Sequence, residues 1–114
     1  MPPRRCLLDE NLPRRLAGHF SEAYGVVSVH DTPYRSYKNG KLLRAMIDDG
    51  YDCLITADQN LAYQQNLNAL SLGLLVIVTR DIRLPALVTH FAAIEQALSR
   101  LQVGQLVHVN LITK

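Results

Sequence analysis

The run from Leu74 to Thr79 constrains the fold more than any other feature of this sequence. It reads Leu-Leu-Val-Ile-Val-Thr, with no alternation between apolar and polar residues. A strand with one face in water would alternate, whereas a strand covered on both faces can be apolar throughout. Such strands are typical of parallel sheets with helices on both sides. The run therefore predicts an α/β protein.

Strand and helix patterns alternate along the rest of the chain. We expect further strands at 6–8, 26–29, 53–56 and 106–111, and helices at about 11–23, 40–49, 59–70 and 85–101. Gly25 and Gly50 are expected to end the first two helices. This order predicts a three-layer α/β/α sandwich with a mainly parallel central sheet of about five strands. With 114 residues, the chain is expected to form one domain over residues 1–114.

Composition excludes several classes of protein. A net charge of +2 means that any nucleic-acid binding must depend on local clusters of cations. The N-terminal segment lacks the pattern of a signal peptide, and no apolar run is long enough to span a membrane. We expect a cytoplasmic protein in which Cys6 and Cys53 are buried and reduced. The sequence contains no glycine-rich phosphate loop, nucleophile elbow or CxxC pair.

Acidic residues follow several of the expected strands. Asp9 and Glu10 follow the first strand, Asp31 the second and Asp58 the third. Parallel strands bring their carboxyl ends to one edge of a sheet, where ligands bind. Carboxylates gathered there suit Mg²⁺ or Mn²⁺, which can activate water against a phosphodiester. Asp9 and Asp58 are the main candidates. Glu10 is a weaker one, because it would face away from Asp9 if the strand continued.

Simpler roles for these acids remain open. Asp9 and Asp58 each precede an expected helix, so either can serve as a helix cap. Asp31 is more typical of a turn residue than of a metal ligand. The histidines show no spacing typical of metal ligands and are expected to be structural or exposed.

Positive charges gather between Thr32 and Ile47, a segment without acidic residues. Cations that bind phosphates, together with aromatic rings on which bases stack, are the means by which single-stranded nucleic acids are held. The alternative is an ordinary solvated loop and helix face. The arginine pairs 4–5 and 14–15 can add to a positive rim around the end of the first strand. The residues that supply these groups are Arg14, Tyr34, Arg35, Tyr37, Lys38, Lys41 and Arg44.

Side-chain amides are dense over residues 59–68, beginning with Gln59 and Asn60. Amides both donate and accept, and therefore suit base edges, phosphates or metal-bound water. A polar helix face without a ligand is the alternative. Asparagine at this density is unusual for a plain helix.

Three segments resemble the PIN-like domain proteins grouped as DUF5615 and their close relatives. They are Leu7–Leu16 (LLDENLPRRL), Lys38–Leu43 (KNGKLL) and Leu54–Leu67 (LITADQNLAYQQNL). The resemblance spans nearly the whole chain, and the third segment is the most specific. It implies a PIN-like fold, Mg²⁺- or Mn²⁺-dependent RNA cleavage and the toxin role in a bacterial toxin–antitoxin pair. RNA and a cognate antitoxin are the implied partners, and we also consider a homodimer.

The resemblance places Asp9 and Asp58 on the family's acidic positions. It also places Lys38, Asn39, Asp58, Gln59 and Asn60 on signature positions. Two departures stand out. Lys41 replaces the glutamate of the Asn-Gly-Glu found in many relatives, and Asn60 replaces a second acid of broader relatives.

Three functions follow as hypotheses. The first is a PIN-like ribonuclease, and the second is a PIN-like module that binds RNA or protein with weakened catalysis. The third, a phosphoryl-receiver domain, shares the acid pair after the first strand. It requires a lysine after its last strand, however, and residues 106–111 contain none.

Overall fold

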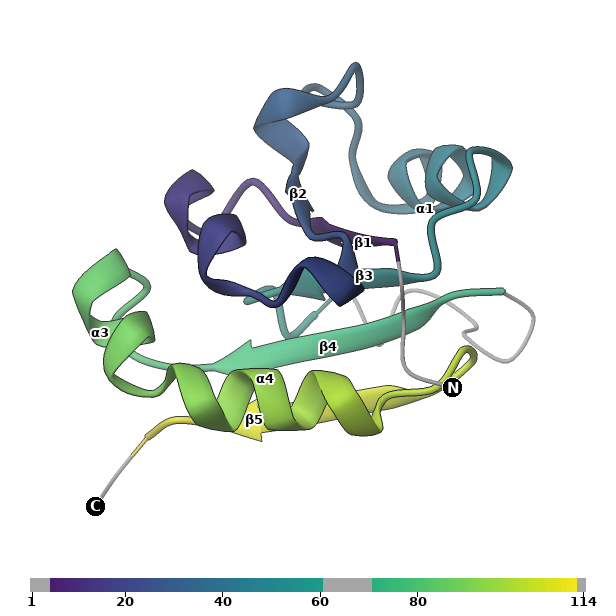
Figure 1. Ribbon diagram of the computed structural model, residues 1–114. Coiled ribbons are helices and arrows are strands. Elements are labelled where there is room, and N and C mark those ends of the chain that lie inside the picture. The colour runs from purple at the N-terminus through teal and green to yellow at the C-terminus, as the bar shows by residue number, and fades with distance from the viewer. Residues whose placement is uncertain (1–4, 61–70, 113–114) are drawn as a thin grey trace.

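A computed structural model of the chain describes residues 5–60 and 71–112 (Figure 1). Its strands are β1 (Cys6–Leu8), β2 (Val27–Ser28), β3 (Cys53–Thr56), β4 (Gly73–Val78) and β5 (Leu106–Asn110). Its α-helices are α1 (Asn39–Asp48), α3 (Leu84–Thr89) and α4 (Phe91–Arg100). Three short 3₁₀ helices are η1 (Arg14–His19), η2 (Glu22–Tyr24) and η3 (Val29–Asp31).

The five strands form one sheet in the order β2-β1-β3-β4-β5. Every neighbouring pair is parallel. The α/β class and the parallel five-stranded sheet predicted from the sequence are therefore confirmed. The chain moves from β1 to the β2 side and then returns past β1 to β3, so the strand order reverses between β1 and β3. Ligand sites of open parallel sheets form outside the carboxyl ends of the strands at such a reversal.

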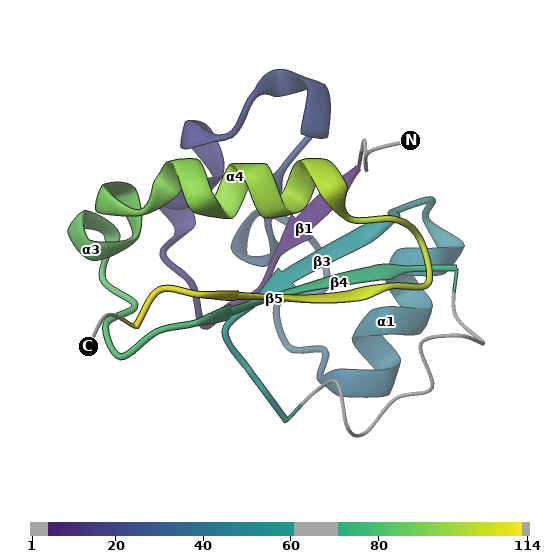
Figure 2. The same ribbon diagram turned by 90° about the horizontal axis from the view of Figure 1, so that it is seen from below.

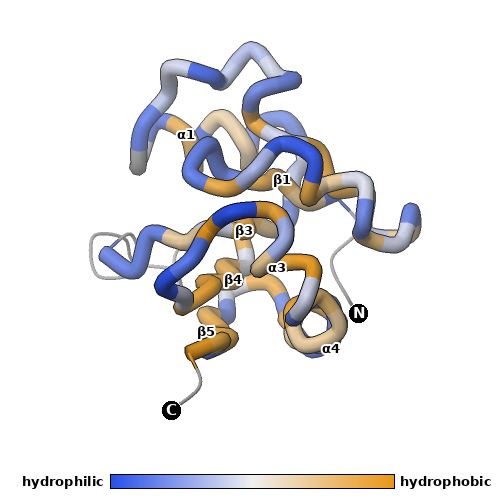
Figure 3. The backbone as a smooth tube through the Cα atoms, turned by 90° about the vertical axis from the view of Figure 1, so that its left-hand side faces the viewer, coloured by the Kyte–Doolittle hydropathy of each residue, from blue (hydrophilic) through white to orange (hydrophobic). Residues whose placement is uncertain are grey.

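Each face of the sheet has its own hydrophobic core, because successive side chains of a strand point to opposite faces. Cys6 and Leu8 of β1 pack with residues of η1, α3 and α4, whereas Leu7 packs with residues of α1. Figure 2 shows α3 and α4 on one side of the strands and α1 on the other. Figure 3 shows the hydrophobic residues concentrated in the strands, β4 above all, and more hydrophilic residues in the connections.

Two predicted features of β3 and its surroundings are confirmed. Gly50 has φ +83°, the left-handed conformation expected of a glycine that follows a helix. Cys6 and Cys53 face each other in the β1–β3 register, and both are buried and unbridged. Burial raises the pKa of the Cys53 thiol well above its usual value, and contact with Cys6 raises it further.

The helix predicted over 11–23 is wrong. The structure instead has two 3₁₀ helices, η1 and η2, over residues 14–19 and 22–24. Gly18 lies in the middle of the segment and weakens an α-helix there. The side chain of Ser21 then accepts a hydrogen bond from the Ala23 N–H and starts a separate turn. Gly25, at φ +56°, ends that turn as expected.

The helix predicted over 85–101 is divided at His90 into α3 and α4. The Thr89 hydroxyl donates to the Pro85 carbonyl at 2.9 Å, a bond of the kind that bends helices. The second predicted strand is shorter than expected, since η3 begins at Val29. The helix predicted at 59–70 lies almost entirely outside the described residues. No described helix is both long and apolar enough to cross a membrane.

Candidate active site

Asp9 and Asp58 meet where β1 and β3 end. The two strands are hydrogen-bonded neighbours, and the Asp9 N–H donates to the Ile55 carbonyl at 2.8 Å. Both carboxylates line one cavity of about 250 Å³. The predicted juxtaposition of these two residues, 49 positions apart in the sequence, is confirmed. We call this space the strand-end cavity; its lining residues are Asp9, Glu10, Asn11, Tyr37, Lys38, Leu42 and Asp58.

The Thr56 hydroxyl holds the two acidic segments together. It is fully buried and donates to Asp9 Oδ2 at 2.7 Å. It also accepts from the Asp58 N–H at 3.0 Å and from the Asn11 amide at 3.3 Å. Its one proton is thus committed to Asp9, while its lone pairs face two donors. Thr56 therefore positions the Asp9 carboxylate.

Asn11 forms the second connection between the two strand ends. Its amide nitrogen donates to Thr56 Oγ1, and its oxygen accepts from the Ala57 N–H at 3.3 Å. We expected Asn11 to begin the helix predicted at about 11–23 and did not single out Thr56. A threonine that ends a buried strand two residues before an acid is a local signal for Thr56. The role of Asn11 depends on the β1–β3 pairing.

The Asp9 carboxyl group lies in a negatively charged setting. Burial raises its pKa, and the nearby charges of Glu10 and Asp58 raise it further. Hydrogen bonds from Thr56 and from the Glu10 N–H, the latter at 2.8 Å, act in the opposite direction. Among the described residues, none forms an ion pair with Asp9, Glu10 or Asp58. A cation entering the cavity would relieve this repulsion.

Glu10 lines the same cavity as Asp9, although we expected it to face away. That expectation assumed a strand continuing through Glu10, and the structure corrects it. β1 ends at Leu8, and a turn follows, in which the Leu12 N–H donates to the Asp9 carbonyl. The alternation of side chains therefore stops before Glu10.

The donor set suits a single hard cation. Asp9 and Asp58 supply two carboxylates to one cavity, and Mg²⁺ is commonly held by one or two carboxylates with several waters retained. Within residues 5–60 and 71–112, no three histidine, cysteine or acidic side chains come together as a metal-holding group. A cage made entirely of protein ligands is thus not formed by the described residues.

The amide residues after β3 are only partly described. Gln59 and Asn60 lie in an exposed turn, where the Asn60 N–H donates to Asp58 Oδ1 at 3.0 Å. This bond fixes one oxygen of Asp58. The remaining amide-rich residues, 61–68, lie outside the described part of the chain. Asn39 begins α1.

Several predicted cations lie beside the strand-end cavity. Lys38 lines it directly, together with Tyr37. Lys41 and Arg44, on α1, line an adjoining cavity of about 320 Å³, to which Tyr37 also contributes. Arg35 is exposed in the preceding loop. We call this second space the helix-side cavity; its lining residues are Tyr37, Gly40, Lys41, Arg44, Ala45 and Asp48.

Other predicted cations are placed differently. Arg14 forms an ion pair with Asp31, and its Nε donates to Asp31 Oδ2 at 3.1 Å. Arg5 lies at the amino end of β1, where it stacks over Tyr51 at 4.4 Å and donates to the Asp49 carbonyl. Arg5 therefore lies at the sheet edge opposite the strand-end cavity, so the positive rim predicted from the arginine pairs is wrong for this residue. Arg14 is already paired with Asp31.

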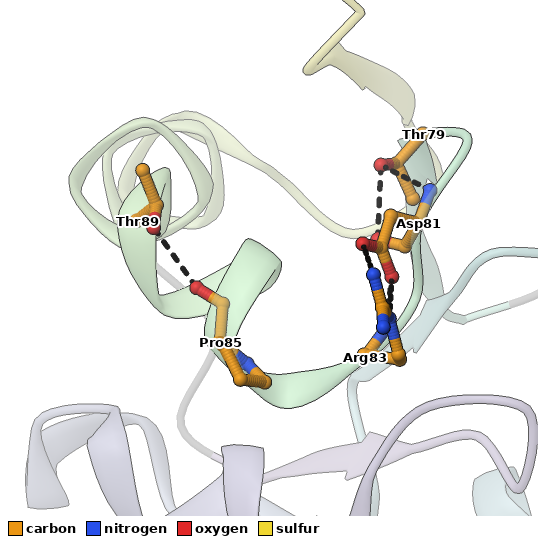
Figure 4. A network of polar contacts seen from close by, with 5 residues as sticks. All are labelled: Thr79, Asp81, Arg83, Pro85 and Thr89. Atoms are coloured by element: carbon orange, nitrogen blue, oxygen red, sulfur yellow. Dashed lines mark hydrogen bonds and ion pairs between the residues drawn. The ribbon is translucent and has the colours of Figure 1, made fainter.

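The end of β4 carries a second polar network, drawn in Figure 4. Asp81 accepts from Arg83 through both carboxylate oxygens, at 2.9 and 2.7 Å. This bidentate pair lowers the pKa of Asp81 to about 2. Thr79 accepts from the Asp81 N–H and donates to the Asp81 carbonyl, both at 3.2 Å. Asp81 is therefore neutralised within its own turn.

No family model, curated protein or solved structure matches this chain in the comparisons with known proteins.

Proposed function

We propose that this protein is a metal-dependent ribonuclease of the PIN-like kind. The observation that carries the proposal is the pair Asp9 and Asp58, which line one cavity at the reversal of strand order and form no ion pair with any described residue. The resemblance of the three sequence segments supports the same activity and the same two residues.

The chain's own residues would prepare the site for a phosphodiester. A Mg²⁺ or Mn²⁺ ion held by Asp9 and Asp58, with Glu10 beside them, would supply Lewis-acid chemistry and an activated water. Thr56 holds one oxygen of Asp9, and the Asn60 N–H holds one oxygen of Asp58. Both carboxylates are thus oriented before any ligand binds, which limits reorganisation during the reaction.

Cations beside the cavity support RNA as the substrate. Lys38 lines the cavity, and Lys41 and Arg44 continue the positive charge along α1. Gln59, Asn60 and Asn39 extend the proposed contact surface through their positions next to Asp58 and Lys38. Phosphate contacts from such residues hold a strand without reading its sequence. Arg14 is left out, because Asp31 occupies it.

The biological setting of the proposal rests on the resemblance alone. It is the toxin of a bacterial toxin–antitoxin pair, acting in the cytoplasm and restrained by a cognate antitoxin protein. A homodimer belongs to the same proposal.

A second candidate function is a PIN-like module that binds RNA or protein with weakened catalysis. The specific observation in its favour is that the described residues contain no group of three acidic metal ligands. Lys41 and Asn60 also stand where relatives carry acids. In this case the cations would retain their binding role.

Incubating the protein with labelled RNA and Mn²⁺ tests the proposal. We expect cleavage by the wild type and none by Asp9→Asn, with Asp81→Asn as a matched control that changes an acid at the same sheet edge outside the cavity. Mn²⁺ binding, measured separately by calorimetry, should weaken in Asp9→Asn alone. Binding of RNA without cleavage at any Mn²⁺ concentration would favour the second candidate.

A further inference from the structure

Tyr37 connects the two cavities on the proposed RNA surface. Its side chain is half-buried and lines both the strand-end cavity and the helix-side cavity. Lys38, the next residue, lines only the first cavity, and Lys41 lines only the second. Tyr37 is therefore placed to contact a ligand that occupies both cavities.

The two tyrosines of the basic loop have different roles. Tyr34 is 8% exposed, and its hydroxyl donates to Asp49. Its ring also contacts the rings of Tyr37 and Tyr51, at centroid distances of 5.7 and 6.2 Å. Tyr34 is thus part of the core that includes residues of α1, and its ring packs against the ring of Tyr37. Tyr37 presents its ring to the Lys41 ammonium, which lies 4.1 Å from the ring centroid.

The helix-side cavity has walls suited to a flat ligand. Gly40 and Ala45 bring little side-chain volume to it, and Tyr37 is the aromatic residue of its lining. Lys41 and Arg44 supply positive charge, and Asp48 supplies a carboxylate. An aromatic ring beside two cations matches a nucleotide, because every base offers a π-face and every nucleotide a phosphate.

We propose that the helix-side cavity is a nucleotide subsite next to the Asp9–Asp58 centre. This inference rests on the proposed function, and it adds where the RNA strand leaves the cleavage site and how one base is chosen. The base stacks on Tyr37, while Lys41 and Arg44 bind the phosphates that flank it.

Lys41 has a double role in this subsite. Its ammonium covers the face of Tyr37 on which a base would stack. A cation–π contact at an exposed site is weak, so an incoming base can replace the ammonium on the ring. The displaced ammonium then reaches the strand's phosphate. The departure from the Asn-Gly-Glu pattern at position 41 thus supplies a phosphate ligand in place of an acid.

Asp48 gives the subsite a preference among bases. An ionised carboxylate only accepts hydrogen bonds, and it pairs with the amino group of cytosine. Uracil has a carbonyl oxygen at the same position and would be repelled. Cytosine should therefore bind better than uracil, although the two rings have the same size.

Fluorescence anisotropy with labelled oligocytidylate and oligouridylate of equal length tests the subsite. The full chain is used in EDTA, so that no metal-dependent cleavage occurs. We expect the wild type to bind oligocytidylate about fivefold to tenfold more tightly than oligouridylate. Asp48→Asn should abolish this difference, because an amide both donates and accepts.

Two Tyr37 variants test the stacking. Tyr37→Ala should weaken binding of both oligonucleotides about tenfold, as expected for the loss of one base–aromatic stack. Tyr37→Phe should restore most of that affinity, since it keeps the ring. Circular dichroism of each variant confirms that it is folded.

The outcomes separate the subsite from the nuclease. Equal affinities of the wild type for the two oligonucleotides, an unchanged affinity in Tyr37→Ala or no RNA binding by the wild type would each overturn the subsite. Tyr37-dependent binding without Mn²⁺-dependent cleavage would support the subsite and overturn the nuclease. Cleavage that is lost in Asp9→Asn but indifferent to Tyr37 and Asp48 would do the reverse.

Discussion

The ends of β3 and β4 carry the same local pattern and reach different chemistry. Thr56-Ala57-Asp58 begins at the last residue of β3, and Thr79-Arg80-Asp81 directly follows β4. In both, the threonine hydroxyl accepts from the aspartate N–H, at 3.0 and 3.2 Å. In both, the aspartate Oδ1 accepts from the N–H two residues later, at 3.0 Å. The backbone turns are therefore alike.

The difference lies in the neighbours of each turn. Arg83, two residues after Asp81, also reaches its carboxylate, whereas Asn60, two residues after Asp58, contributes only its backbone N–H. Thr79 donates within its own turn, whereas Thr56 donates across the sheet to Asp9. The β3 end therefore keeps carboxylate charge available to a ligand, and the β4 end neutralises it. This contrast makes the β4 end a natural control for the proposed site.

The largest expected difference between the β3 end and the β4 end is in Mn²⁺ binding. At a Mn²⁺ concentration of about 100 times Kd, binding adds about 2.7 kcal/mol to the free energy of unfolding. We expect Asp58→Asn to lose most of this gain and Asp81→Asn to keep it, as measured by urea denaturation with and without Mn²⁺. Equal Mn²⁺ stabilisation of the two variants would remove the contrast and the proposed metal site with it.

Removing the two threonine hydroxyls should give the next largest effect. Thr56→Val removes the partner of Asp9 Oδ2, of the Asn11 amide nitrogen and of the Asp58 N–H in a partly buried place, at a cost of about 2–3 kcal/mol in unfolding free energy. Thr79→Val should lower the unfolding free energy by less than about 1 kcal/mol, because the backbone groups that Thr79 contacts can form hydrogen bonds with water instead. Urea denaturation measures both.

The conservative variant Thr56→Ser serves as the control for that comparison. It keeps the hydroxyl and should recover most of the stability lost in Thr56→Val. Similar losses in the two valine variants would show that the bond across the sheet adds nothing to the local turn.

The pH dependence of stability should have opposite signs for Asp9, which Thr56 joins to the β3 end, and for Asp81 at the β4 end. The pKa of Asp9 is raised in the folded protein, so the folded state holds a proton that the unfolded state releases above about pH 3.9. Stability from this group therefore falls as the pH rises through the folded-state pKa. The pKa of Asp81 is lowered to about 2, so its contribution is present above the unfolded value and is lost as the pH falls toward about 2.

Asparagine variants isolate these two contributions. As the pH rises above about 3.9, Asp9→Asn should gain stability relative to the wild type. Below that pH, the deficit of Asp81→Asn relative to the wild type should shrink toward zero. Urea midpoints across a pH series test both trends. A difference between Asp9→Asn and the wild type that does not change with pH would contradict the raised pKa.

Local patterns predicted the sheet well and the 3₁₀ and broken helices poorly. The apolar runs at β3 and β4 predict, to within one residue, where these strands begin and end, and Gly50 predicts the end of α1. The helical spacing at 11–23 and 85–101 does not show where a chain changes direction. The Thr89–Pro85 bond and the Ser21 turn decide that, and both are alternatives to continuous helical hydrogen bonding.

The sequence predicted those acidic residues of the candidate site that lie just after a strand. Asp9 and Asp58 follow strands, and a parallel sheet brings such residues to one edge. Thr56 and Asn11 act across the β1–β3 boundary, which depends on the strand order and not on any local pattern. For the same reason, the pairing of Arg14 with Asp31 and the position of Arg5 at the other edge were missed.

The smallest expected effect is a change in the salt dependence of RNA binding when single cations are removed. Lys38 and Lys41 line the proposed RNA surface, whereas Arg83 is held by Asp81. Removing one cation that binds a phosphate should lower the slope of log affinity against log salt by about 0.7 for a single strand. Replacing both lysines with alanine should therefore flatten the slope by about one to one and a half, measured by anisotropy in EDTA. Arg83→Ala alters the net charge as much as either single lysine substitution does, yet it should leave the slope unchanged, because Asp81 already occupies that cation. A slope that responds equally to Lys38→Ala, Lys41→Ala and Arg83→Ala would mean that RNA responds to overall charge and not to a surface around Asp9 and Asp58.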